Sequence, residues 1–132
     1  MSRHTILVIE DSPVVQHLFL ATFKALDVDV VVAGDGLSGI EAAHVHQPDI
    51  ITLDIGLPDV DGWEVLTRLR ASEVTAGISV LVVTAHAQPT VAAAAEESGV
   101  DGFMTKPFRP ADLRDLVQQL LGRVPAELAA AV

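Results

Sequence analysis

Five polar residues have the types that metal-assisted phosphoryl chemistry requires, and each comes at the end of a short apolar run. They are Glu10, Asp11, Asp54, Thr84 and Lys106. Three carboxylates that lie close together repel one another, and at least one takes up a proton unless a cation lies among them. Carboxylate oxygens are hard ligands and the chain has no cysteine, so the expected cation is Mg²⁺. An aspartate at such a site can attack phosphorus and form an aspartyl phosphate.

The two remaining residues suit the same reaction. Phosphoryl transfer depends more on positioning and charge neutralisation than on covalent help from the protein. The ammonium group of Lys106 and the hydroxyl of Thr84, with nearby backbone N–H groups, can contact the phosphoryl oxygens that the metal leaves free. No serine, histidine or cysteine nucleophile is required.

The pattern of the chain predicts the elements that bring these residues together. Short apolar runs, most of them β-branched, alternate about five times with longer segments of helical period, as is typical of a parallel α/β sheet. Continuously apolar runs are expected of strands that helices cover on both faces. The predicted strands span residues 6–9, 28–33, 50–53, 80–83 and 102–105. Right-handed crossovers give a doubly wound sheet, whose sites lie at the carboxyl ends of the strands.

The strongest helical pattern lies between the first two strands. Its stripe of residues at three- and four-residue spacing comprises Val14, Val15, Leu18, Phe19, Thr22, Phe23 and Leu26. Ser12 and Pro13 supply its N-cap and first-turn proline. Weaker helical patterns cover residues 37–46, 63–71, 89–98 and 111–121. Gly122, followed by Pro125, is expected to end the last helix.

Length and composition indicate one domain. Half of the 132 residues are apolar, which suffices for a core without cross-links, so we expect a domain at 1–122 and a short tail at 123–132. The formal net charge is −10 and the eight Lys and Arg residues are scattered, which disfavours direct binding to nucleic acid. The first apolar run is too short for a signal peptide or a membrane span. With no cysteine, we expect a soluble cytoplasmic protein.

In four segments the sequence resembles the receiver domains of two-component response regulators, and the resemblance covers about residues 5–121. The segments occur in the family's order and read ILVIEDSP, LDIGLPDVDGWE, VVTAHA and MTKPF. Four such segments at family spacing carry far more weight than any one motif. The resemblance implies a flavodoxin-like strand order, 2-1-3-4-5, and a cis peptide bond between Lys106 and Pro107.

The resemblance also implies a role for each acidic residue. Asp54 is the phosphoryl acceptor. Glu10 and Asp11 hold Mg²⁺ together with Asp54 and the carbonyl group of Gly56. Glu10 stands where the family most often has aspartate, and because its side chain is one methylene longer, both a direct bond to the metal and a contact through water are open to it.

The resemblance further implies that Thr84 and Lys106 contact the phosphoryl group, and that Phe103 changes rotamer as the Thr84 region moves. His86 lies two residues beyond Thr84, where the family's side chain borders the phosphoryl group and helps to set its rate of hydrolysis. Gly56, in the corresponding place after the acceptor, offers no side chain. We therefore predict that His86 controls the lifetime of the phosphoryl group.

Taken singly, most of these residues have an ordinary structural explanation. Asp54 could end a strand before a turn, and Asp11 could lead into a helix cap. Thr84 could be a β-branched strand residue and Lys106 a solvated surface charge. Phe103 could simply pack in the core. The functional assignment depends on their occurring together.

Two other sets of residues are assigned to structure. Asp59, Asp61 and Gly62 are expected to form the turn after the acceptor and to start the following helix. Four histidines are expected at the surface, namely His4, His17, His44 and His46.

Phosphorylation would add a charge of about −1.5 to −2 beside existing acids, and should shift an existing equilibrium between two conformations. The resemblance implies that the output surface lies on the fourth helix, fifth strand and fifth helix, with Val91, residues 92–95, Phe103 and Arg114. DNA-binding receivers typically dimerise there through charge pairs, but residues 89–98 include no basic side chain. We therefore expect a monomer or weak dimer, and a stand-alone receiver in a chemotaxis-like or phosphorelay role, with an attached output domain beyond Val132 left open as the alternative.

The expected phosphodonor is a histidine kinase or a histidine phosphotransfer protein, and the downstream target is left open. The domain is expected to signal rather than to be an enzyme, catalysing only its own phosphorylation and dephosphorylation. One alternative is a small Mg²⁺-dependent phosphatase that uses an aspartyl phosphate. Such enzymes usually carry a second aspartate two residues after the nucleophile, where this chain has Gly56. Another alternative is a receiver-like module that never receives phosphate.

Overall fold

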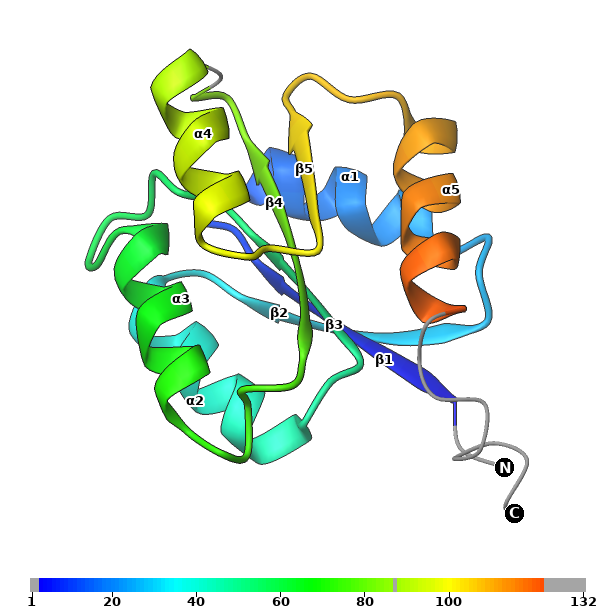
Figure 1. Ribbon diagram of the computed structural model, residues 1–132. Helices are drawn as coiled ribbons and strands as arrows, with labels where there is room; N and C mark the ends of the chain where they lie inside the picture. Colours follow the sequence, from blue (N-terminus) through cyan, green and yellow to red (C-terminus); the bar gives the residue numbers. More distant parts are fainter. Residues whose placement is uncertain (1–2, 87, 123–132) are drawn as a thin grey trace.

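A five-stranded sheet forms the centre of the computed structural model, which describes residues 3–86 and 88–122 (Figure 1). The strands are β1 (His4–Ile9), β2 (Val28–Ala33), β3 (Ile50–Leu53), β4 (Ser79–Thr84) and β5 (Gly102–Thr105). Their order is β2-β1-β3-β4-β5, and every neighbouring pair is parallel. This order confirms the predicted doubly wound sheet, in which the chain builds outward from β1 on both sides.

Five helices among the described residues connect the strands. They are α1 (Pro13–Phe23), α2 (Gly36–His46), α3 (Gly62–Ala71), α4 (Pro89–Glu97) and α5 (Pro110–Leu121). Helices α1 and α5 cover one face of the sheet, α2 and α3 cover the other, and α4 lies beside α3 (Figure 1).

Successive residues of the inner strands point to opposite faces of the sheet, and each face has its own hydrophobic core. On β1, Ile6 and Val8 belong to the core beneath α1 and α5, whereas Leu7 and Ile9 belong to the core beneath α2 and α3. Side chains alternate between the two faces of a strand, and here both faces are covered by helices. The strands therefore need apolar residues at consecutive positions, which explains the continuous runs in the sequence.

The predicted apolar stripe of α1 is only partly correct. Phe19, Thr22 and Phe23 are buried, but Val14 is 78% exposed and Leu18 is 38% exposed. The predicted stripe is broader than the surface that α1 presents to the sheet and to α5, and one of its flanks faces solvent. Val14 and Leu18, four residues apart, lie on that flank.

Polar side chains cap two helices as predicted. The hydroxyl of Ser12 accepts a hydrogen bond from the backbone N–H of Val15 at 3.4 Å, at the start of α1. The carboxylate of Asp61 accepts one from Glu64 at 2.9 Å, at the start of α3. These bonds satisfy N–H groups that have no partner within the helix.

Several predicted boundaries are wrong by a few residues, as is usual for frayed element ends. Strand β1 begins at His4, so this histidine lies in the strand and not before it. Helix α1 ends at Phe23, so Leu26 follows the helix. Helix α4 ends one residue earlier than predicted, at Glu97.

The last described helix ends where the sequence predicts. Gly122 follows α5, with right-handed backbone angles and a φ of −65°. The expected contribution of Pro125 and the predicted tail at 123–132 lie outside the described residues. Within the described part of the chain, no helix is both long enough and apolar enough to cross a membrane.

Gly62 is a sharp test of this packing. A Cβ atom at Gly62 would lie 2.6 Å from the carbonyl oxygen of Asp54 and 2.7 Å from the Cα of Ile55. Backbone atoms cannot move aside cheaply, so Gly62→Ala should lower the free energy of unfolding by about 1–3 kcal/mol in urea denaturation. Gly77→Ala is the matched control, because a Cβ there meets nothing within 4 Å. Equal stability of the two variants would contradict the close approach.

Candidate functional site

The predicted site residues converge at the carboxyl edge of the sheet. Glu10 follows the last residue of β1 and Asp54 follows the last residue of β3. These two strands pair with Ile9 opposite Leu53, which makes the two acids neighbours. Thr84 is the last residue of β4, and Lys106 follows β5. The placement rule for doubly wound sheets therefore identifies the correct edge.

Three carboxylates form a cluster at this edge. Glu10, Asp11 and Asp54 each offer an oxygen, and these oxygens lie within 4.8 Å of one another. Glu10 and Asp54 are buried, at 1% and 7% exposure, whereas Asp11 is exposed. Hard oxygen donors with one side open to water suit Mg²⁺, which binds through few carboxylates and keeps several waters. The donor set therefore fits a magnesium ion.

The ammonium group of Lys106 already neutralises part of the cluster. Its Nζ donates hydrogen bonds to Glu10 Oε1 and, at 3.0 Å, to Asp54 Oδ2. With all groups ionised, three carboxylates and one ammonium leave a formal charge of −2. A divalent cation would balance that charge.

For both Glu10 and Lys106, burial and hydrogen bonding shift the pKa in opposite directions. Burial raises the pKa of Glu10 above its ordinary value, against the lowering effect of the hydrogen bond from Lys106. For Lys106, burial favours the neutral amine, but the hydrogen bonds to Glu10 and Asp54 outweigh it and raise the pKa. Lys106 therefore stays charged at neutral pH.

Backbone contacts hold Glu10 in place. Its Oε2 accepts a hydrogen bond from the N–H of Ser12 at 3.0 Å, and its own N–H donates to the carbonyl of Ala33 at 3.0 Å. The side-chain amide of Gln16 donates to its carbonyl at 2.6 Å. The longer side chain of glutamate thus lets one residue contact both the start of α1 and Lys106.

The two predicted tuning positions lie against each other. A Cβ atom added at Gly56 would lie 2.7 Å from Nε2 of His86, so the imidazole occupies the space that a larger residue would need. The N–H of Gly56 donates to Asp54 Oδ1 at 3.2 Å. The N–H of His86 donates to the hydroxyl of the fully buried Thr84 at 3.1 Å.

Phe103 and Lys106 lie on neighbouring parts of the chain. Phe103 is half-buried on β5, opposite Val82 of β4, and packs against the core beneath α2 and α3.

The Lys106–Pro107 peptide bond is cis, as expected. Phe108 then packs on Phe19 of α1, with ring centroids 5.2 Å apart. This contact ties the loop that carries Lys106 to the opposite core.

The remaining histidines lie apart from the acidic cluster. His17, His44 and His46 are exposed, as predicted. His4 is half-buried, and its Nδ1 lies 3.4 Å from a carboxylate oxygen of Asp49.

One part of the predicted output surface is wrong. Ala95 is only 1% exposed and faces the interior, whereas Ala92 and Ala93 are exposed and Val91 is half-buried. A helix that rests on the sheet must bury one face, and Ala95 is the one buried residue of α4. Arg114 of α5 is half-buried.

Sequence reasoning missed a structural role of Asp59. Its carboxylate accepts hydrogen bonds from the N–H groups of Gly36 and Leu37, at 2.8 and 2.9 Å. The hydrogen bond from Leu37 is the main cause that lowers the pKa of Asp59 to about 2. The two partners lie more than 20 residues earlier in the chain, so no local pattern could have revealed the contact.

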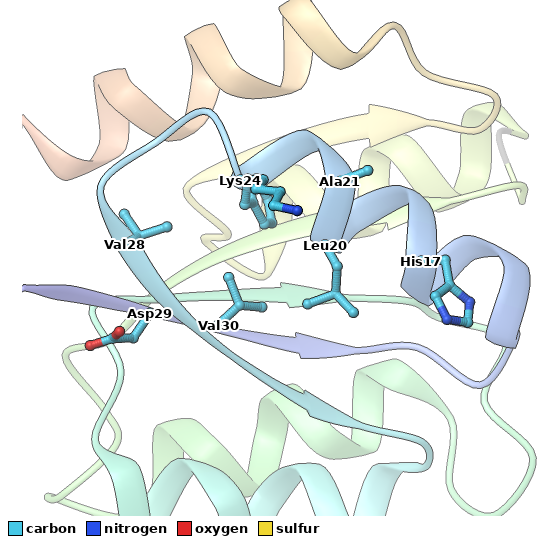
Figure 2. A pocket seen from close by; sticks show the side chains of 8 residues that line it. His17, Leu20, Ala21, Lys24, Val28, Asp29 and Val30 are labelled. Atoms are coloured by element: carbon cyan, nitrogen blue, oxygen red, sulfur yellow. The ribbon is translucent and has the colours of Figure 1, made fainter.

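Hollows also lie outside the cluster, and two of them adjoin α1. A small apolar one of about 270 Å³ adjoins Lys106 and is lined by Val15, Leu18, Ala85, Lys106, Pro107 and Phe108. Figure 2 shows a larger one of about 560 Å³ between α1 and β2. Its polar side chains are His17, Lys24 and Asp29, and it shares no residue with the acidic cluster. The cluster remains the candidate site, because among the described residues it is the group that combines metal ligands with the ammonium group of Lys106.

Comparisons with known proteins agree with this geometry. The family model described as the response regulator receiver domain matches residues 6–118. The transcriptional regulator RpaA of Synechocystis, named as DNA-binding, is 41% identical over 118 residues. The regulatory protein PhoP of Bacillus subtilis, named for alkaline phosphatase synthesis, is 34% identical over 125 residues. These matches cover 89% and 95% of this chain but 49% and 50% of the relatives, so the chain spans about half their length.

Solved receiver domains share the fold. The signal receiver domain of a protein described as a Luxo repressor from Vibrio parahaemolyticus has a TM-score of 0.88 at 28% identity, covering 98% of this chain and 97% of that one. The receiver domain of a sensor histidine kinase from Pseudomonas aeruginosa has a TM-score of 0.84 at 28% identity, covering 92% and 99%. That structure has a magnesium ion coordinated in its active-site cleft.

Mg²⁺ should stabilise the folded chain through the acidic cluster. A ligand that binds only the folded state raises Tm, and its contribution to stability grows as RT ln(1 + [L]/Kd), which is about 2.7 kcal/mol at 100 times Kd. Asp11→Ala should remove most of the Mg²⁺-dependent rise in Tm, because one of the three carboxylates of the cluster is lost, while the exposed position tolerates alanine. Asp115→Ala, another exposed acid, is the control and should keep the full rise. Equal Mg²⁺ shifts in both variants would exclude Asp11 from the site.

Proposed function

The chain belongs to the response regulator receiver domain family, and from this premise we propose that it accepts a phosphoryl group on Asp54 with the help of bound Mg²⁺. The observation that carries the proposal is the bridge from Lys106 to Asp54 and Glu10 inside the acidic cluster. The family is one of signalling domains. In this role the chain catalyses its own phosphorylation and dephosphorylation and turns over no separate substrate. Members of the receiver family generally work in the cytoplasm, and we propose the same compartment for this chain.

Asp54 is the nucleophile of the proposed transfer. A carboxylate oxygen of Asp54 attacks phosphorus, the bond from phosphorus to the donor's histidine nitrogen breaks, and the electron pair of that bond stays on the leaving imidazole. Glu10, Asp11, Asp54 and the carbonyl of Gly56 would hold Mg²⁺, with Glu10 bound either directly or through water. When bound, the ion neutralises charge on the phosphoryl oxygens.

Lys106 and Thr84 would contact the transferred group. Lys106 lies within 3.0 Å of Asp54 Oδ2 and needs little movement to reach a phosphoryl oxygen. The hydroxyl of Thr84 accepts a hydrogen bond from His86. A hydroxyl has one proton to donate as well as lone pairs, so that proton is free to bind a phosphoryl oxygen.

The proposed output surface is α4, β5 and α5, with Phe103 as a switch residue. Helix α4 buries one residue, Ala95, whereas each other helix buries at least three. No side-chain hydrogen bond caps the start of α4. A helix with so few anchoring contacts can shift at low cost when Thr84 moves.

An apolar surface beside the acceptor supports a protein phosphodonor. Val14 and Leu18 are exposed on α1, and Leu18 also lines the hollow that contains Lys106 and Phe108. Apolar residues exposed together mark an interaction surface more often than scattered ones do. We propose that a histidine kinase or histidine phosphotransfer protein docks here and brings its phosphohistidine to Asp54.

The chain itself is proposed to act by protein contacts, as a monomer or weak dimer. Eight basic residues against eighteen acidic ones disfavour a cationic surface for nucleic acid. The relatives named as DNA-binding regulators match this chain over about half of their own length.

Intact-mass measurement tests the acceptor. After incubation with Mg²⁺ and acetyl phosphate, the native chain should gain the mass of one phosphoryl group, and Asp54→Ala should gain none. Glu64→Ala, which removes an exposed acid from α3, should still be modified. Multiple turnover of phosphoesters without a retained adduct would favour a phosphatase instead. No reaction with the native chain would favour a receiver-like module that does not take phosphate.

The contact between His86 and Gly56 predicts an effect on phosphoryl lifetime. The imidazole covers the side of the acceptor that glycine leaves open, so His86→Ala should admit water and speed dephosphorylation. His44→Ala is the control, since His44 is exposed and hydrogen-bonded to Ser72. An unchanged dephosphorylation rate for His86→Ala would reject the role.

A further inference from the structure

The loop between β3 and α3 has to hold its shape for the metal site to form. Residues 54–61 connect the two elements and carry the carbonyl of Gly56. Inside the loop, the N–H groups of Leu57 and Gly62 both donate to the carbonyl of Ile55, at 3.1 and 2.9 Å. These bonds fix the local turn, but they do not fix the loop relative to the rest of the molecule.

Asp59 supplies that external attachment. Its Oδ1 accepts a hydrogen bond from the N–H of Gly36 at 2.8 Å, and its Oδ2 accepts one from the N–H of Leu37 at 2.9 Å. The first N–H groups of a helix have no partner within the helix. Because two carboxylate oxygens bind two adjacent donors, the contact fixes orientation as well as distance.

Helix α2 does not depend on Asp59 for its cap. Asp35 already accepts a hydrogen bond from the N–H of Ser38 at 2.7 Å, which is the ordinary N-cap contact. Asp59 lies in the loop between β3 and α3, so its hydrogen bonds connect that loop to the start of α2.

Close packing reinforces the bridge. A Cβ atom at Gly36 would lie 2.4 Å from a methyl group of Val60 and 2.9 Å from one of Val65. The absence of a side chain at Gly36 lets Val60 and the start of α3 press directly on the first turn of α2. The loop is thereby held against α2 by one polar and one apolar contact.

We propose that Asp59 is a positioning residue for the metal site. By clamping the loop to the start of α2, it keeps the carbonyl of Gly56 at a fixed place beside Asp54 and Asp11. This inference rests on the proposed function, since it assumes that Mg²⁺ binds the cluster. Residues that hold a ligand in place without touching the metal typically change affinity by about 10- to 100-fold when removed.

Isothermal titration calorimetry with Mg²⁺ tests the clamp. Asp59→Ala should raise the Kd for Mg²⁺ by about tenfold, and Asp59→Asn, which keeps one oxygen acceptor, should raise it less. Asp35→Ala is the matched control, because it removes the half-buried carboxylate that caps the same helix start but leaves Asp59 bonded to Gly36 and Leu37, and its Kd should match that of the native chain. Equal weakening in Asp59→Ala and Asp35→Ala, or no weakening in Asp59→Ala, would overturn the inference.

The native chain separates this inference from the proposed function. If the native chain itself binds no Mg²⁺, both fail. If it binds Mg²⁺ and Asp59→Ala binds equally well, only the clamp fails.

Phosphorylation kinetics supply a second readout. With acetyl phosphate, Asp59→Ala should need about tenfold more Mg²⁺ for half-maximal rate, but should approach the native rate at saturating Mg²⁺. General damage to the fold would instead lower the saturated rate, and that result would contradict a positioning role.

Discussion

The balance of charge between Lys106 and the carboxylates of Glu10 and Asp54 is the constraint on which the site depends. The bonded partners are 96 and 52 residues apart in sequence, so only a sheet that gathers the carboxyl ends of β1, β3 and β5 at one edge can form them. Strand β4 lies between β3 and β5. Lys106 must therefore reach across the end of β4, and Thr84 comes to lie between the lysine and β3. One interaction thus brings the carboxylate of Asp54, the ammonium group of Lys106 and the hydroxyl of Thr84 together.

This arrangement does not exist for stability. Burying charged groups costs free energy even when they are paired, and apolar substitutes of similar size often serve a fold as well or better. Glu10 is almost fully buried, and burial raises its pKa. The surrounding apolar packing offsets that cost. Phe108 packs on Phe19, and the strands that precede Glu10 and Asp54, β1 and β3, are buried on both faces. A costly cluster that leaves two negative charges uncompensated is consistent with a cation as a working part of the site.

The sequence predicts those features whose cause lies in short stretches of chain. Strands that helices cover on both faces must be apolar throughout, so continuous apolar runs in the sequence identify them. Sites of doubly wound sheets lie at the carboxyl ends of the strands, and this rule then predicts where the acidic cluster lies. The sequence predicts the buried face of a helix less well, because periodicity defines an apolar stripe but not which residues of that stripe contact the sheet. This explains why Val14 and Leu18 are exposed and why Ala95 is buried. The attachment of Asp59 to α2 joins segments more than 20 residues apart, and no local propensity encodes it.

In the proposed function, the contrast between a rigid site and a lightly held α4 would give the fold a route for transmitting phosphorylation. A ligand shifts an equilibrium only through its different interactions with the two states. Glu10 and Lys106 are already fixed by several hydrogen bonds, so they can absorb little movement. Thr84 is different, because its hydroxyl is bonded to the backbone of His86 in the connection from β4 to α4. A phosphoryl group that attracted this hydroxyl would also pull on that connection, and α4, which buries a single residue, would offer the least resistance.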